Sequence, residues 1–138
     1  MKQIEAIAHN IGMSYKFGTY KEVNHLFDRS DTFPAAAELL PLQGSFELKF
    51  ESVKDSQDIT LLFLDVDSKT VDSEKTAEVV DRMKSKALEF VKTLNETDEF
   101  EFIDGVQLPY YTIVKQFDKC LSGIEITLNL RPNTAVCL

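Results

Sequence analysis

Three closely spaced carboxylates, Asp65, Asp67 and Asp72, are the best metal-binding candidates in the chain. Calcium prefers carboxylate oxygens, and a loop of the EF-hand type needs oxygen donors at its first, third, fifth and twelfth positions and glycine at its sixth. Counted from Asp65, the fifth position is Lys69 and the sixth is Thr70. The pattern fails. We therefore expect no metal site here, but a solvated connection between a strand and a helix, ending in a helix N-cap.

A thiolate–imidazole pair is the second candidate, built from Cys120 and either His9 or His25. Such a pair would activate the sulfur as a nucleophile. With two histidines and two cysteines in the chain, however, some pairing is expected by chance, and there is no G-x-S-x-G nucleophile elbow. Cys137 stands next to the last residue and is expected to be exposed. We therefore predict no catalytic residue and no enzymatic activity.

Cofactor binding has equally little support in the sequence. Gly44, Gly105 and Gly123 are isolated and expected at turns, so no glycine-rich phosphate loop is present. Tyr110 and Tyr111 could stack on a base, but a stacking platform needs positive charge around it. We interpret them as half-buried residues at the start of a strand, and we predict no cofactor.

The overall charge argues against nucleic acid as a partner. The chain carries 15 Lys and Arg against 23 Asp and Glu, a formal net charge of −8. Phosphate binding needs clustered cations, because much of the affinity comes from counterion release. The longest basic grouping, residues 82–86, falls on the polar side of a predicted helix, so we interpret it as a solvated face. The same balance disfavours anionic membrane surfaces.

The sequence also indicates synthesis in the cytosol. Residues 1–6 lead directly into an amphipathic pattern with an early acid, so we expect no secretory leader. No apolar run approaches the roughly 20 residues that cross a bilayer. Cys120 and Cys137 are too few for a disulfide scaffold and lack C-x-x-C spacing. Reduced thiols in the cytosol fit this usage.

Hydrophobic periodicity predicts the elements that would position these residues. A chain of 138 residues is expected to form one domain, since domains usually span about 100–200 residues. Helical spacing and strict alternation of apolar residues distinguish helices from strands. Helices are predicted over residues 2–11 and 73–95, and strands over 34–41, 45–51, 59–66, 100–103, 110–117 and 124–131. The sequence of residues 14–32 does not distinguish between a short helical turn and an irregular strand.

The last of these strands has the clearest pattern. Apolar and polar residues alternate without interruption over residues 124–131, which predicts one dry and one wet face and hence an antiparallel sheet. Strands cluster along the chain and do not alternate with helices. We therefore predict an α+β fold, a mainly antiparallel sheet of five to six strands with two helices packed on one face.

The middle of the chain is predicted to form a hairpin. Residues 45–51 alternate, so Phe46, Leu48 and Phe50 are expected to point inward, with polar residues 52–58 as the turn. Before them, three consecutive alanines favour a helix by propensity. We choose a strand because prolines bracket a piece of strand length over residues 34–41.

The edges of such a sheet and the end of the chain offer surfaces for other proteins. Unpaired backbone groups on an edge strand can recruit another chain. Pro132 prevents simple extension of the final strand, and residues 133–138 are expected to form a short flexible tail. The tail carries Val136 and Leu138 free of the sheet, where they could dock onto a neighbour. The predicted domain thus spans residues 1–138.

Read in order, these elements resemble the tail-completion or tail-terminator proteins of long-tailed bacteriophages. The resemblance rests on the opening helix, on Phe33-Pro34-Ala35-Ala36-Ala37 leading into a strand, on the hairpin, and on the long helix that follows. The ending over residues 117–130, of the form F-D-x-x-L-x-G-I-x-I-x-L-x-L, is similar to closing segments of small phage and prophage proteins from gut Bacteroidetes such as Bacteroides.

The resemblance implies a structural virion protein of the tail without a catalytic site. Copies would self-associate head to tail into a ring, a homo-oligomer that contacts the tail tube on one side and the connector on the other. No functional residue is carried over from the family. The alternative is a small bacterial binding or adaptor module that recruits a peptide or small ligand through a sheet edge or groove.

Overall fold

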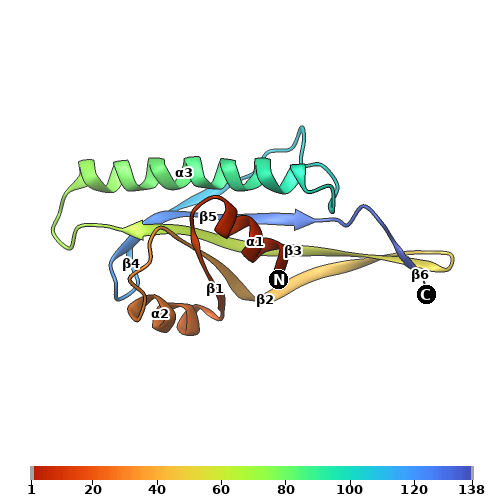
Figure 1. Ribbon diagram of the computed structural model, residues 1–138, viewed down its shortest axis with the longest axis horizontal. Coiled ribbons are helices and arrows are strands. Elements are labelled where there is room, and N and C mark those ends of the chain that lie inside the picture. The colour runs from red at the N-terminus through yellow and green to blue at the C-terminus, as the bar shows by residue number, and fades with distance from the viewer. Residues whose placement is uncertain (1, 138) are drawn as a thin grey trace.

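A mixed β-sheet forms the centre of the fold and carries helices on both faces (Figure 1). The computed structural model describes residues 2–137. In chain order the elements are α1 (Lys2–Asn10), β1 (Ser14–Gly18), α2 (Tyr20–Asp28), β2 (Ala35–Lys49), β3 (Ser52–Val66), α3 (Ser73–Glu96), β4 (Tyr110–Gln116), β5 (Leu121–Leu130) and β6 (Val136–Cys137).

The sheet is antiparallel except at one end. Its strand order is β1-β2-β3-β5-β4, and β6 pairs with β3 off this path. Only the β1–β2 pairing is parallel among the named strands of residues 2–137. The predicted α+β class and mainly antiparallel sheet are therefore confirmed.

The larger core lies between one face of the sheet and helices α1 and α3. Asp72 begins α3 as its N-cap, with the carboxylate accepting a hydrogen bond from the Lys75 amide at 3.1 Å. Phe90 of α3 meets Phe63 of β3 edge to face, with ring centroids 5.5 Å apart. The helix buries one stripe along its length, namely Val79, Val80, Met83, Ala87, Phe90 and Leu94.

The two predicted helices, α1 and α3, pack on one face of the sheet, but a third helix that was not predicted, α2, covers the opposite face. Figure 1 places α2 below the sheet and α3 above it. Thr19 and Glu22 form a capping box that begins α2. Val23 and Phe27 are the buried residues of this nine-residue helix. Residues 14–32, which the sequence left open, thus contain β1 and α2.

The hairpin of β2 and β3 is longer than predicted. Each strand has 15 residues, and residues 52–58, expected to be a turn, belong to β3. The chain reverses at Phe50 and Glu51 instead, where Glu51 has a φ of 62°. A 15-residue strand spans about 50 Å and the 24-residue α3 about 36 Å, so the hairpin outreaches the helix that covers it.

Two further predictions near the end of the chain are wrong. The expected strand over residues 100–103 reduces to one antiparallel bridge between Phe100 and Pro132. Val136, expected free of the sheet, lies opposite Val53 of β3. Leu138 falls outside the described residues. Within residues 2–137, no helix has the length and apolar character needed to cross a membrane.

Candidate functional site

The three candidate metal ligands do not converge. Asp65 pairs with Arg82 at 3.1 Å, and Asp72 caps α3. Asp67 is turned into the protein, where its side chain has no exposed area. Within residues 2–137, no group of three or more His, Cys, Asp or Glu side chains is placed to hold a metal ion.

Asp67 lies at the centre of a buried polar network, so our prediction of a solvated connection is wrong at this residue. Its carboxylate accepts hydrogen bonds from Ser122 Oγ and Thr76 Oγ1, both at 2.7 Å, and from the Ser68 amide. Lys115 Nζ lies 3.8 Å away. Burial raises the pKa of Asp67, but these hydrogen bonds outweigh it and hold the pKa below its usual value. The network ties the start of α3 to the central strands.

Cys120 does not meet either histidine. It lies in the turn between β4 and β5, and its Sγ donates to the Ser68 carbonyl at 3.4 Å. His9 and His25 are exposed on α1 and α2. No hydrogen bond joins Cys120 to a histidine among the residues that the structure describes. The sulfur therefore lacks a base to activate it in this arrangement.

The tyrosine pair and the basic grouping lie next to each other at the β4 edge of the sheet. Tyr110 and Tyr111 are 47% and 67% exposed. Lys84 of the basic grouping stands over the Tyr110 ring, with its Nζ 4.7 Å from the centroid. Lys84 also approaches Asp81 at 4.0 Å, and Lys86 pairs with Glu89 at 3.6 Å. The cations of the basic grouping thus lie among carboxylates, as the sequence indicated.

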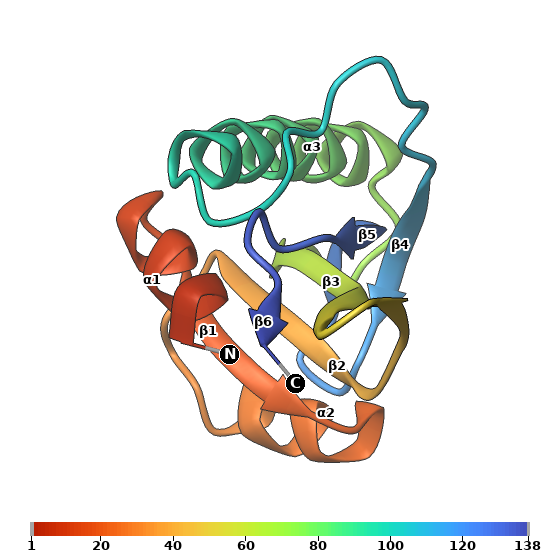
Figure 2. The ribbon, with the colours of Figure 1, turned by 90° about the vertical axis from the view of Figure 1, so that its right-hand side faces the viewer.

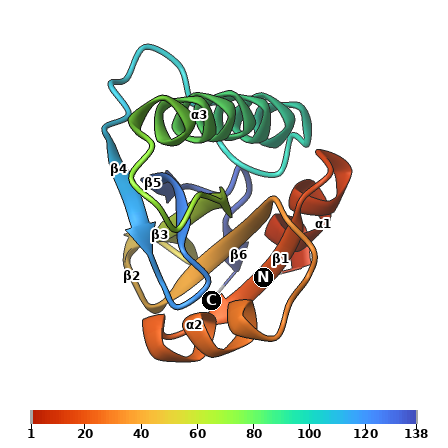
Figure 3. The same cartoon turned by 90° about the vertical axis from the view of Figure 1, so that its left-hand side faces the viewer.

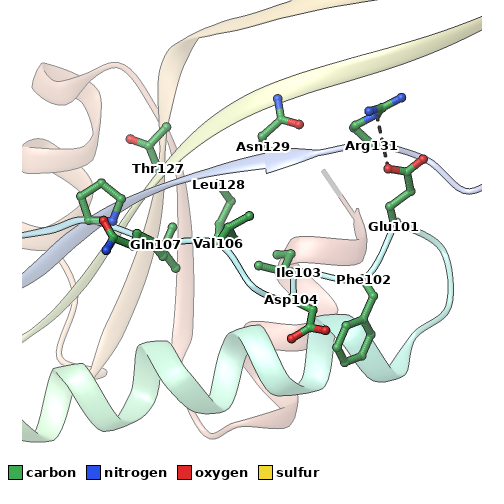
Figure 4. A pocket seen from close by; sticks show the side chains of 12 residues that line it. Glu101, Phe102, Ile103, Asp104, Val106, Gln107, Thr127, Leu128, Asn129 and Arg131 are labelled. Carbon is green, nitrogen blue, oxygen red and sulfur yellow. Dashed lines mark ion pairs between the residues drawn. The ribbon is translucent and has the colours of Figure 1, made fainter.

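A pocket of about 330 Å³ opens where the loop after α3 runs beside the end of β5 (Figure 4). Thr127, Asn129 and Arg131 point away from α3 at this place (Figure 4). Glu101 of the loop pairs with Arg131 Nε at 3.4 Å across the pocket. This ion pair engages two of the three charged side chains that line the pocket, and Asp104 is the third.

The outer half of the hairpin is the most unusual surface of the molecule. We name residues 43–58 the arm; Figure 1 shows it projecting beyond the helices. Phe46, Leu48 and Phe50 of the arm, which we expected to point inward, are 72%, 70% and 93% exposed. Large apolar side chains exposed together in this way mark an interaction site, because isolated ones are common but a contiguous group is not.

The apolar residues of the arm lie on one of its two faces. Leu42 packs against the core under α3, and the two-residue period of a strand places Phe46 and Leu48 on that same face. Leu48 lies opposite Val53, and Val53 lies opposite Val136 of β6. An apolar row thus crosses three strands, and its two outer members, Leu48 and Val136, are 70% and 68% exposed. Figure 2 views this end of the molecule directly.

The other face of the arm is held by ion pairs. Glu47 binds Arg131 at the end of β5, and Lys54 binds Glu101 at 3.4 Å. Glu47 and Lys54 are cross-strand neighbours, so the network spans the arm and anchors it to the body. The arm is therefore a supported projection with a polar, tethered face and an apolar, uncovered face.

Sequence reasoning found the residues of the arm but assigned them to the core. The residues of the partner strand indicated that these apolar side chains would not be buried. Opposite Phe46 stands Asp55, and opposite Gly44 stands Gln57. Two of the three second-strand residues on this face, Asp55 and Gln57, are polar, so Phe46 has no apolar cross-strand neighbour to pack against. No protein-family model matches the chain, and no curated protein sequence matches it.

Proposed function

We propose that this chain is a non-catalytic structural subunit of a phage or prophage tail, similar to tail-terminator or tail-completion proteins, that assembles as a ring at the end of the tail tube. The observation that carries the proposal is the arm. Phe46, Leu48 and Phe50 are largely exposed and lie beyond the helices that cover the core, so they add little to the fold of a single copy. Burial against another protein accounts for the exposure of these apolar side chains in a single copy.

The order of the elements supports the same proposal. An opening helix, a long hairpin, a long helix and two closing strands follow one another, as in the resemblance to tail terminators. The projecting arm of one copy and the surface of the neighbouring copy that receives it are different parts of the molecule. Contacts between unlike surfaces propagate from copy to copy and close into a ring when the rotation permits.

The proposed partners are proteins only. Copies of the chain contact one another, the tail tube below and the connector above, and the chain reaches the virion tail after synthesis in the bacterial cytoplasm. The formal net charge of −8 suits such protein surfaces better than a nucleic acid.

Electron microscopy of particles that lack the chain tests the proposal. Tails without a terminator-like subunit should be irregular in length or open at the head-proximal end, and the wild-type gene supplied in trans should restore them. A matched gene carrying Phe46→Ser and Phe50→Ser should fail to restore them, although the exposed positions leave the fold intact. Normal tails of normal length in the deletion would overturn the proposal.

The groove between α3 and the edge strand β4 favours a second candidate, a binding or adaptor module. Its inner part is a pocket of about 290 Å³ lined by Leu88, Val91, Tyr110 and Ile126 among others. Short extended apolar peptides would then shift the NMR signals of Leu88 and Tyr110 in a chain that stays monomeric. Absence of such shifts at millimolar peptide would count against this function.

Alkylation of Cys120 tests our expectation that the chain is not a thiol enzyme. Cys120 is only partly exposed, and its Sγ is engaged with the Ser68 carbonyl. We expect Cys120 to be alkylated much more slowly than the exposed Cys137 under native conditions. Rapid labelling at pH 6 would indicate an activated thiolate and contradict a purely structural role.

A further inference from the structure

The outer edge of β4 is open to an additional strand. β4 ends the sheet, and on its outer side no strand pairs with it within residues 2–137. This edge lies on the side of the molecule away from α1, and the N-terminal part of α3 lies nearest to it (Figures 2 and 3). A free strand edge next to a helix is an arrangement into which an extended segment adds as a further strand.

The space between α3 and β4 is a crevice with an apolar inner part and a more polar outer part, which Asp72, Asp81 and Lys115 also line. It consists of two adjoining pockets of about 290 and 510 Å³, and Lys84 lines both. Leu88 of α3 is 72% exposed at its rim, and Val114 of β4 is 48% exposed. Apolar side chains of an added strand would cover these groups, and the burial of this apolar surface would favour association.

The arm has a free edge of matching length. β1 pairs with β2 only as far as Leu39, so the outer edge of β2 from Gln43 to Lys49 has no strand beside it in the described chain. This edge has seven residues by count (43 to 49), as does β4. Phe46 and Leu48 are two residues apart and lie on one face of this edge strand. An added strand needs this spacing to place successive side chains in a groove.

One charge on the arm is opposite in sign to a charge in the crevice, Lys84, which has Asp81 4.0 Å away on its own helix. Asp55 lies opposite Phe46 on the arm and on the same face, and it is exposed. The crevice presents Lys84 beside the Tyr110 ring. When Phe46 enters the crevice, the cross-strand position of Asp55 brings its carboxylate toward the Lys84 ammonium. Opposite charges across a contact fix the register and suppress wrong pairings.

We propose that the arm of one copy adds as an edge strand beside β4 of a second copy, with Phe46 and Leu48 under α3 and Asp55 at Lys84. Donor and acceptor lie on different parts of the molecule, so each copy can give one arm and receive another. The inference rests on the proposed self-association of the tail subunit and names the two surfaces that meet.

Paired charge reversals test this contact in the full chain. Asp55→Lys places a cation against Lys84, and Lys84→Asp places an anion against Asp55, so each variant alone should associate at least about tenfold more weakly than wild type. An equimolar mixture restores opposite charges at every contact, because each variant's arm then meets the other's crevice. We expect the mixture to regain wild-type association in sedimentation velocity at low salt.

Two controls separate docking from folding. Lys92→Asp makes the same charge change at an exposed position of α3 outside both pockets, and Asp31→Lys does so in the loop before β2. Both should associate like wild type. Circular dichroism melts should show that all four variants are folded, since Asp55 and Lys84 are surface residues.

The outcomes distinguish this inference from the proposed function. If wild type associates but neither reversal weakens it, or if the mixture stays dissociated, the contact lies elsewhere and the inference fails while self-association stands. A wild-type chain that remains monomeric to about 1 mM also overturns it, because the contact would then contribute less than about 4 kcal/mol. The tail function is judged separately, by the appearance of particles that lack the chain.

Discussion

Gly123 of β5 lies directly against the backbone of Phe63 in β3: a Cβ built on Gly123 would stand 1.8 Å from the Phe63 carbonyl oxygen. The sequence placed Gly123 at a turn before the final strand, but it lies within β5. The two central strands of the sheet can approach this closely only because glycine has no side chain at that point.

Gly123→Ala should therefore destabilise the protein strongly. The added methyl group must push apart two central strands, and we expect a loss of about 2–4 kcal/mol in the free energy of unfolding measured with urea. Gly105→Ala is the matched control: Gly105 has a φ of 67° but no atom within 4 Å of the added Cβ, so the backbone strain alone should cost about 1 kcal/mol. Equal losses for both variants would contradict the close packing.

Asp67→Asn should weaken the protein at neutral pH and less so in acid. The folded state lowers the pKa of Asp67, so its contribution is present above the unfolded pKa and is lost as the pH falls through the folded one. We expect the variant to lose about 2–4 kcal/mol at pH 7, because a buried hydrogen-bonded charge is removed.

The difference between wild type and Asp67→Asn should shrink below about pH 4, where Asp67 protonates in the unfolded chain. Thermal melts across pH 2.5–8 provide the measurement. Asp31→Asn is the control, because the Asp31 side chain is fully exposed and its change should leave the stability and its pH dependence almost unaltered. A constant difference at all pH values would exclude the ionised carboxylate as the cause.

Phe27→Ala should be far more damaging than Phe46→Ala. Phe27 of α2 is fully buried and contacts the Phe117 ring, with centroids 5.3 Å apart. Its truncation should cost about 3–5 kcal/mol. Phe46 is 72% exposed, so its truncation should cost less than about 0.5 kcal/mol in a dilute, monomeric sample. Comparable losses in urea denaturation would mean that the arm belongs to the core after all.

Thr19→Ala should remove the cap of α2. The Thr19 hydroxyl accepts a hydrogen bond from the Glu22 amide at 3.3 Å, and the loss of an N-cap costs about 1 kcal/mol. Hydrogen exchange should speed up in residues 20–28 ahead of the rest of the protein. Thr134→Ala, at an exposed bend, should change neither measurement.

Periodicity in the sequence predicted the long helices and strands that bury one whole stripe or face of side chains. The helix expected over residues 73–95 is α3, and the strand expected over residues 124–131 coincides with β5 up to Leu130, because a full stripe or face of apolar residues leaves little choice of period. α2 could not be seen in the same way, since only Val23 and Phe27 of its nine residues are buried.

The candidate site was less predictable because alternation reports the period of a strand and not what covers it. Phe46 and Leu48 have the spacing of core residues, yet they extend past the end of α3. Asp67 was misread for the opposite reason: an isolated aspartate in a polar stretch gives no sign that Ser122, distant in sequence, will bury it. Both errors concern contacts between distant parts of the chain.

The pairing of β6 with the arm also provides a spectroscopic probe. Cys137 is exposed and lies opposite Ser52, next to the tip of the arm. An environment-sensitive fluorophore attached there, in a chain with Cys120→Ser, would sit beside the apolar row. Its emission would report directly when and how fast that row is covered, in a single copy or in an assembling particle.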